Sequence, residues 1–205
     1  MAARPLSVML NPSCQYGNRI VGPEGQLWYN EAVSMFRLAL SVQYHLKRHE
    51  DITVCLSRPT EDAPSTLAEE MALARQTNCD LLLALHSNAP GPRHPATSGQ
   101  ITFYRDGDEG SLALAQKVHC HLLAATSDAY PSVMDHGVCT HWLRLAALWQ
   151  SGCPSALVEV LFHTHPLERA LLLDPSFQDR AGQALADGIW AFIVAERRRG
   201  ECVSS

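Results

Sequence analysis

The hydrophobic positions of the chain fall into two kinds of pattern. Short apolar or alternating runs predict strands at residues 6–10, 52–56, 81–85, 100–104 and 156–162. Apolar residues at helical spacing predict helices at 30–49, 66–76 and 112–122, and two more that start at Pro166 and Pro175. Strands that alternate with helices indicate an α/β domain with a mainly parallel, twisted sheet of about six strands and helices on both faces. We expect one such domain over residues 1–200 and a tail at 201–205.

Three segments lack a clear regular pattern. Residues 11–25 are polar and contain proline and glycine, so they predict a long loop, and a loop of this length is more often functional than a simple connector. Residues 130–142 are irregular and polar. Residues 143–148 form a short apolar run whose type the pattern leaves open.

Composition and charge narrow the class of protein. The chain has 205 residues, of which 46% are hydrophobic and 18% charged, as is ordinary for a globular domain. The net charge of −5 and the lack of a large basic cluster argue against nucleic-acid binding. No apolar stretch approaches the ~20 residues that span a bilayer, and the first residues do not look like an export signal.

The seven cysteines are odd in number and show no CxxC spacing. This usage argues against a disulfide framework or a structural zinc knuckle. It predicts thiols that are mostly reduced and buried.

The run at 81–85 ends on three polar residues, His86, Ser87 and Asn88. In open α/β sheets, ligands bind beyond the carboxyl ends of strands, so this is where we expect a site. A histidine that only forms hydrogen bonds at a strand end is the simpler alternative.

Two carboxylates stand where the pattern calls for apolar residues. Asn30 is a good N-cap, and the apolar stripe of the helix that follows leads back to Glu31. Glu159 interrupts the buried run 156–162. Burying a carboxylate is costly without a cation or hydrogen-bond donors, and burial raises its pKa towards the range of a general base. The simpler alternatives are that Glu31 interacts with the helix dipole and that Glu159 reaches solvent.

Together, Glu31, His86 and Glu159 predict one site at an edge of the sheet. Hydrolytic zinc sites use three protein ligands and keep a fourth position for water, whose pKa falls towards ~7. A nearby carboxylate then takes the proton of that water. The pattern therefore points to a zinc hydrolase.

Four blocks, spread over nearly the whole chain, carry a family resemblance. They are Val8–Ser13, Asn30–Glu31 with its long helix, Asp80–Ala89, and Pro154–Phe162 followed by Pro166 and Glu168; Asp135–Val138 and Leu143–Leu145 fit the same pattern. In order and local context they resemble the zinc-dependent N-acetylmuramoyl-L-alanine amidases of the cell-wall amidase type 3 group.

The resemblance implies that Glu31 and His86 bind zinc and that Glu159 is the catalytic acid/base. The implied reaction is hydrolysis of the amide between N-acetylmuramic acid and L-alanine in peptidoglycan, with Ser87 and Asn88 as candidate substrate contacts. One alternative is an inactive amidase-fold module that binds peptidoglycan fragments. Another is a zinc amidohydrolase that acts on a small acylated peptide.

The first turn departs from the family pattern. The family has a Gly-His-Gly turn whose histidine is the first zinc ligand, whereas this chain reads Pro12-Ser13-Cys14-Gln15. A variant subgroup with a Pro-Ser-x-Gln turn is similar. Three possibilities follow: the Cys14 thiolate replaces the imidazole, a distant histidine such as His163 completes the set, or zinc is lost.

The resemblance also bears on where the protein acts. With peptidoglycan as its partner and no export signal, it is expected to be made in the cytoplasm. It would then reach the cell wall as a phage endolysin does, or as an autolysin that lyses the mother cell.

Overall fold

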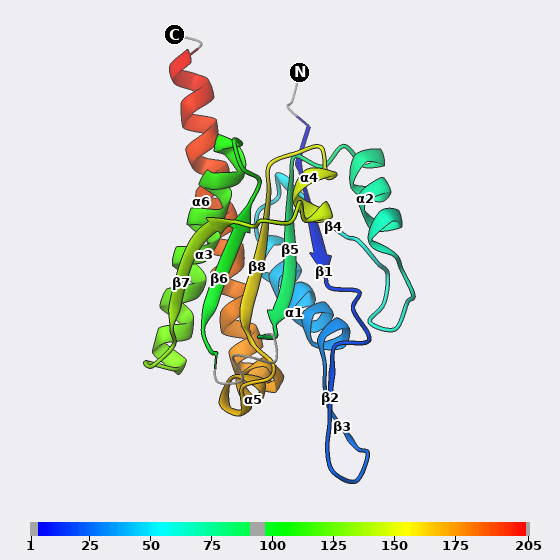
Figure 1. Cartoon of the computed structure of the whole chain (residues 1–205). Coiled ribbons are helices and arrows are strands. Elements are labelled where there is room, and N and C mark those ends of the chain that lie inside the picture. The colour runs from blue at the N-terminus through cyan, green and yellow to red at the C-terminus, as the bar shows by residue number, and fades with distance from the viewer. Residues whose placement is uncertain (1–3, 91–96, 204–205) are drawn as a thin grey trace.

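A computed structural model describes residues 4–90 and 97–203 of the chain (Figure 1). Its centre is a six-stranded sheet in the order β4-β1-β5-β8-β6-β7. The strands are β1 (Leu6–Pro12), β4 (Ile52–Leu56), β5 (Leu81–Asn88), β6 (Gln100–Tyr104), β7 (Asp135–Thr140) and β8 (Ser155–Phe162). The strands from β4 to β8 in this order are parallel. β6 is antiparallel to β8 and parallel to β7, so the sheet is mainly parallel, as predicted.

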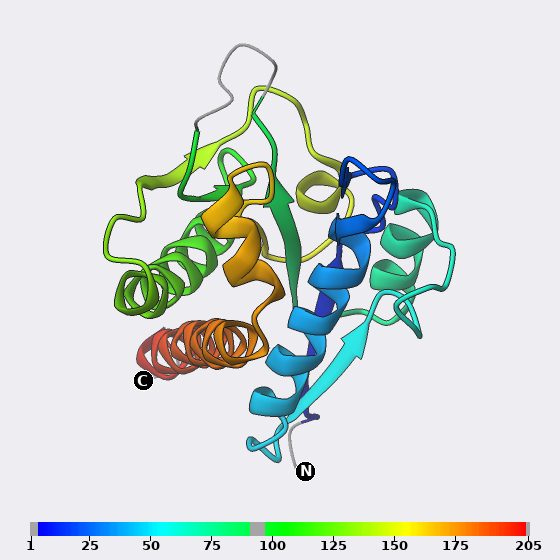
Figure 2. The same ribbon diagram turned by 90° about the horizontal axis from the view of Figure 1, so that it is seen from below.

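Helices cover both faces of the sheet (Figure 2). α1 (Glu31–Leu46), α3 (Glu109–Ala129) and α6 (Pro175–Val203) lie on one face, and α2 (Leu67–Gln76) and α4 (Ala146–Trp149) lie on the other. α5 (Pro166–Leu173) follows β8 at the end of the sheet where β5 also finishes (Figure 1). Within the described ranges, no helix combines the length and the apolar character needed to cross a bilayer.

The central strand β5 shows why its sequence is almost continuously apolar. Leu81, Leu83 and Leu85 pack into the core under α1, α3 and α6. Leu82 and Ala84 point the other way, into the core under α2 and α4. Because successive side chains alternate between two buried faces, every position up to 85 must be apolar.

The predicted helix starts are confirmed by their caps. The Asn30 side-chain oxygen accepts a hydrogen bond from the Val33 N–H at 3.3 Å. Thr66 and Glu69 form the reciprocal capping box expected at the start of α2. The end of the first helix was predicted too late, because α1 finishes at Leu46 and a turn precedes β4.

Three predictions of irregular structure were wrong or incomplete. The segment from Arg19 to Asn30 forms the hairpin of β2 (Arg19–Val21) and β3 (Leu27–Asn30), which projects beyond the sheet (Figure 1). The irregular stretch 130–142 contains the edge strand β7, whose residues are exposed or half-buried. The run 143–148, whose type the pattern left open, ends in the short helix α4, which extends to Trp149.

Candidate active site

Three acid or imidazole side chains meet at the carboxyl ends of β5 and β8. His86 and Glu159 are direct register partners on these neighbouring parallel strands. Glu31 is the first residue of α1, and its Oε1 atom lies 3.0 Å from Nδ1 of His86. The structure therefore brings Glu31, His86 and Glu159 to one edge of the sheet.

Glu159 carries an unusual carboxylate. Its Oε2 atom is buried and has no hydrogen-bond partner within residues 4–90 and 97–203. Burial raises the pKa of Glu159 to about 7, against the opposing charge of His86 and with a further contribution from Glu31. A carboxyl group with this pKa accepts and returns a proton near neutral pH, as a general acid/base does.

Glu31 is held in its ionised form. Burial alone would raise its pKa, but hydrogen bonds and charge from His86, together with hydrogen bonds from Asn18 and Ser13, lower it below its ordinary value. The Asn18 amide donates to Oε2 of Glu31 at 2.7 Å. Both carboxylate oxygens of Glu31 therefore have partners.

His86 lies among several carboxylates. Burial would lower its pKa, but the Glu31 hydrogen bond and the charges of Glu159, Glu31 and Glu70 raise it above the ordinary value. In the described part of the chain, no lysine or arginine pairs with Glu31 or Glu159. The site thus has an excess of negative charge that a divalent cation would balance.

The donor set fits zinc at two positions. A carboxylate oxygen and an imidazole nitrogen are ordinary zinc ligands, and Glu31 and His86 present both at one point. However, residues 4–90 and 97–203 contain no group of three or more His, Cys, Asp or Glu residues placed to hold a metal. A third protein donor of these types is not in place beside the pair.

Cys14 lies in the turn that follows β1. Its half-buried thiol neighbours Glu70 and Ser65, and burial and the Glu70 charge raise its pKa. Glu70 is itself bound by Asn11, whose amide donates to Oε2 at 2.6 Å. These surroundings favour a neutral thiol, and Cys14 lines one cavity together with Glu70 and His86.

His163 is buried in a structural cluster. Its Nδ1 lies 3.0 Å from the Ser87 carbonyl oxygen and 3.0 Å from the Ser87 hydroxyl. Its ring stacks on Tyr29 with a centroid separation of 5.1 Å, and burial lowers its pKa. The Tyr29 hydroxyl donates to Oγ of Ser87 at 2.7 Å, so the Ser87 side chain is also engaged here. Asn88 is half-buried at the strand end, and its backbone carbonyl accepts a hydrogen bond from the backbone N–H of His163 at 3.0 Å.

Sequence reasoning missed two amides of the first turn. Nε2 of Gln15 lies 3.3 Å from Nδ1 of His86. The Asn18 amide donates to Oε1 of Gln15 at 2.9 Å while it also contacts Glu31. The polar composition of the turn was a signal for a functional loop, but it did not show which side chains face the site.

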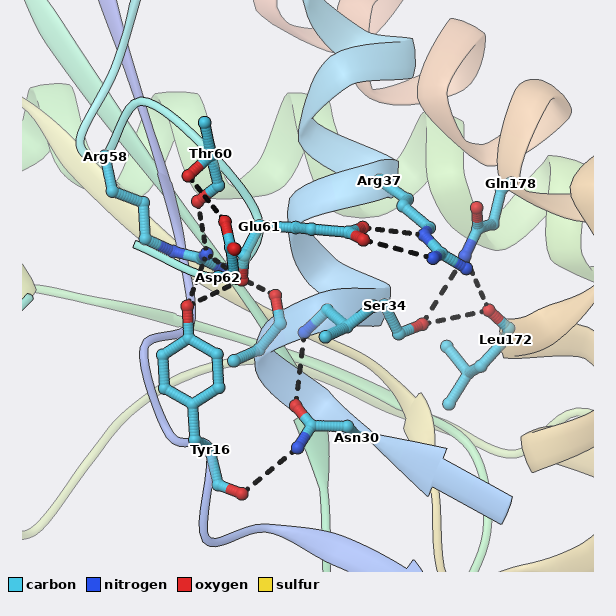
Figure 3. Close-up of polar contacts among 12 residues, drawn as sticks. Tyr16, Asn30, Ser34, Arg37, Arg58, Thr60, Glu61, Asp62, Leu172 and Gln178 are labelled. Carbon is cyan, nitrogen blue, oxygen red and sulfur yellow. Dashed lines mark hydrogen bonds and ion pairs between the residues drawn. The ribbon is translucent and has the colours of Figure 1, made fainter. Parts of the chain in front are cut away.

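A buried arginine fixes this turn. Arg58 donates to the carbonyl oxygens of Ser13 and Ala32, so it ties the turn to the first residues of α1. Figure 3 shows the same guanidinium beside Tyr16, whose hydroxyl donates to the Glu61 carbonyl at 2.6 Å. The turn and the start of α1 are therefore held in one arrangement.

A cavity of about 200 Å³ adjoins His86 on the α2 side of the sheet. Its polar wall includes Asn11, Cys14 and Glu70, and its apolar wall includes Leu145 and Leu157.

Comparisons with known proteins identify the family of the chain. A family model described as N-acetylmuramoyl-L-alanine amidase matches residues 13–191. The chain is 26% identical over 184 residues to an uncharacterized cell wall amidase of Bacillus anthracis, covering 83% of this chain and 33% of that protein. It is 30% identical over 135 residues to N-acetylmuramoyl-L-alanine amidase LytC of Bacillus subtilis, covering 65% and 25%. The chain thus spans a third or less of the length of these curated relatives.

Solved structures share the fold over almost its whole length. The catalytic domain of the N-acetylmuramoyl-L-alanine amidase CwlV from Bacillus (Paenibacillus) polymyxa superposes with a TM-score of 0.77 and 25% identity, covering 92% of this chain and 98% of that one. An N-acetylmuramoyl-L-alanine amidase from Clostridium difficile 630 also gives 0.77, with 24% identity and coverage of 93% and 98%. At 24% identity, the similarity to the Clostridium difficile enzyme shows only a shared fold.

Proposed function

Because the chain belongs to the N-acetylmuramoyl-L-alanine amidase family, we propose that it hydrolyses the amide between N-acetylmuramic acid and L-alanine in peptidoglycan. The observation that carries this proposal is the meeting of Glu31, His86 and Glu159 at one edge of the sheet. We propose zinc as the cofactor, held by Glu31 and His86. The family match and the unbalanced negative charge around His86 support this choice.

When bound, zinc supplies a Lewis acid for the scissile carbonyl and makes a water molecule more acidic. Glu159 accepts the proton of the attacking water, since its carboxyl group has a pKa of about 7 and its buried Oε2 atom has no hydrogen-bond partner among residues 4–90 and 97–203. The same carboxyl group then gives the proton to the leaving amine of L-alanine. Glu31, held ionised by His86 and Asn18, keeps its side chain fixed during these steps.

The surroundings of the site suit this substrate. The cavity of about 200 Å³ beside His86 has Leu145 and Leu157 in its wall and is the candidate position for the methyl group of L-alanine. Asn88 at the end of β5 remains a candidate substrate contact, whereas the Ser87 hydroxyl already contacts Tyr29 and His163.

An inactive binding module is not favoured. The buried Oε2 atom of Glu159, which lacks a partner in the described part of the chain, costs stability, and a module that only binds fragments gains nothing from that cost. The relatives found are amidases.

The decisive experiment is digestion of purified peptidoglycan sacculi by the purified chain with zinc. We expect new L-alanine amino groups and, by mass spectrometry, separated glycan strands and stem peptides. Glu159→Gln should abolish both, whereas Glu61→Gln, at an exposed ion pair with Arg37, should not. Cleavage only between sugars or between amino acids would contradict the proposal.

A further inference from the structure

The residue of the first turn that faces the Glu31–His86 pair is Gln15. Its amide Nε2 lies 3.3 Å from Nδ1 of His86, the same ring nitrogen that contacts Oε1 of Glu31 at 3.0 Å. The Gln15 amide therefore stands at the point where a cation held by Glu31 and His86 would meet a third protein group.

Asn18 links this amide to Glu31. Its Nδ2 donates to Oε1 of Gln15 at 2.9 Å and to Oε2 of Glu31 at 2.7 Å. A carboxamide has a nitrogen donor and an oxygen acceptor of nearly the same shape, so rotation by half a turn presents the oxygen instead. This rotation gives up the hydrogen bond that Gln15 Oε1 accepts from Asn18, and a bond from the oxygen to the cation would replace it. Amide oxygens are neutral, hard ligands for divalent cations.

Gln15 and its neighbour Cys14 line the same cavity beside His86 but have different partners. The Ser13 hydroxyl accepts the Gln15 backbone N–H at 3.2 Å, and Arg58 holds the Ser13 carbonyl at 3.1 Å. In this arrangement Cys14 lies beside Glu70 and Ser65, on the α2 side. Gln15 is exposed, and its side-chain amide contacts His86.

We propose that the Gln15 carboxamide is the third protein group of the metal site and that Cys14 is not a ligand. This inference rests on the proposed zinc dependence. A neutral amide oxygen binds zinc less strongly than imidazole or thiolate, so the site should hold zinc more weakly than three charged or imidazole ligands would.

The test is metal binding by the full chain, freed of metal with a chelator. Zinc titration by calorimetry and cobalt(II) absorption spectra are recorded for the wild type, Gln15→Ala, Gln15→Glu and Cys14→Ser. We expect Gln15→Ala to weaken zinc binding about tenfold or more. Gln15→Glu should strengthen it, because a carboxylate replaces the amide. Cys14→Ser should bind as the wild type does, and the cobalt spectrum should lack a thiolate charge-transfer band.

Other outcomes overturn the inference. A thiolate charge-transfer band that disappears in Cys14→Ser would assign the third position to Cys14. Unchanged zinc affinity in Gln15→Ala, with a melting temperature like that of the wild type, would remove Gln15 from the site. A wild type that binds no zinc overturns both the zinc and the Gln15 assignments, while digestion of sacculi judges the amidase activity separately.

Discussion

The two ends of the strand pair β5–β8 differ in how their polar groups are satisfied. At the carboxyl end, His86 and Glu159 lie side by side on the two strands, and one oxygen of Glu159 has no partner in the described residues. At the amino end, Asp80 accepts hydrogen bonds from the Ser7 N–H and from Arg4, at 2.7 Å or less.

The amino end also brings Cys79 and Cys153 together, with their Sγ atoms 3.3 Å apart in a buried contact. Each polar group named at this end has a partner, as is usual for structure that only supports a fold. At the carboxyl end, by contrast, a buried carboxylate oxygen of Glu159 has no hydrogen-bond partner in the described residues. Polar groups in such unfavourable surroundings are concentrated at functional sites. The same two strands thus serve stability at one end and chemistry at the other.

The largest expected effect is that of Glu159→Gln on catalysis. Loss of the general acid/base should reduce kcat/KM on peptidoglycan by about 10²–10⁴-fold. The melting temperature should not fall, because the neutral amide removes a buried charge that lacks a partner. Parallel activity and thermal-unfolding measurements would check both, and an active variant would exclude Glu159 from the mechanism.

The second prediction concerns how the free energy of unfolding depends on pH at the carboxyl end of the two strands. Its sign is opposite to that expected for Asp80 at the amino end. In metal-free protein, the pKa of Glu159 is raised from its ordinary 4.5 to about 7, so folding favours the protonated form. Its contribution to stability should therefore be lost as pH rises from about 5 to 7, by on the order of 2–3 kcal/mol. Urea unfolding of the wild type and Glu159→Gln across this range measures the difference. Parallel curves for the two proteins would contradict the prediction.

The third prediction concerns His163→Phe. Phenylalanine can keep the stacking on Tyr29 but loses the hydrogen bond to the Ser87 carbonyl, so we expect a loss of about 1–2 kcal/mol of stability. Zinc affinity should stay as in the wild type. If zinc binding were lost in a variant that still folds, His163 would be a ligand.

The smallest effect is expected at the amino end. Burial opposes ionisation of Asp80, but Arg4 and the Ser7 N–H lower its pKa below the ordinary 3.8. Asp80→Asn should cost about 1 kcal/mol at pH 7, since Arg4 is largely exposed. The cost should disappear as pH falls through that lowered pKa, where the wild-type carboxylate is protonated. Denaturant midpoints at pH 7 and pH 3 test this, and amidase activity should not change.

Local sequence patterns predicted most of the fold. The strands 52–56 and 100–104 and the capped helix 67–76 were predicted to the residue or within one, because apolar periodicity and caps act over a few neighbouring residues. The hairpin of β2 and β3 and the strand β7 were missed. Apart from the buried Tyr29, their residues are exposed or half-buried, and strand pairing rather than an apolar pattern defines them.

The site was predictable only in part. Glu31, His86 and Glu159 stand out because each is a polar residue at the edge or inside of an apolar pattern. Gln15 does not stand out, since the choice of which turn residue faces His86 depends on Arg58 and Glu70, far along the chain. A contact of that range leaves no local trace in the sequence.

The Arg58 contacts have a consequence for engineering. One guanidinium joins the carbonyls of Ser13 and Ala32, so the loop after β4 sets the alignment of two segments it does not adjoin in sequence. If the 12–18 loop alone were transplanted into another scaffold, its side chains would lose the backbone orientation that Arg58 gives them. A graft that moves Arg58 and its loop together would preserve both.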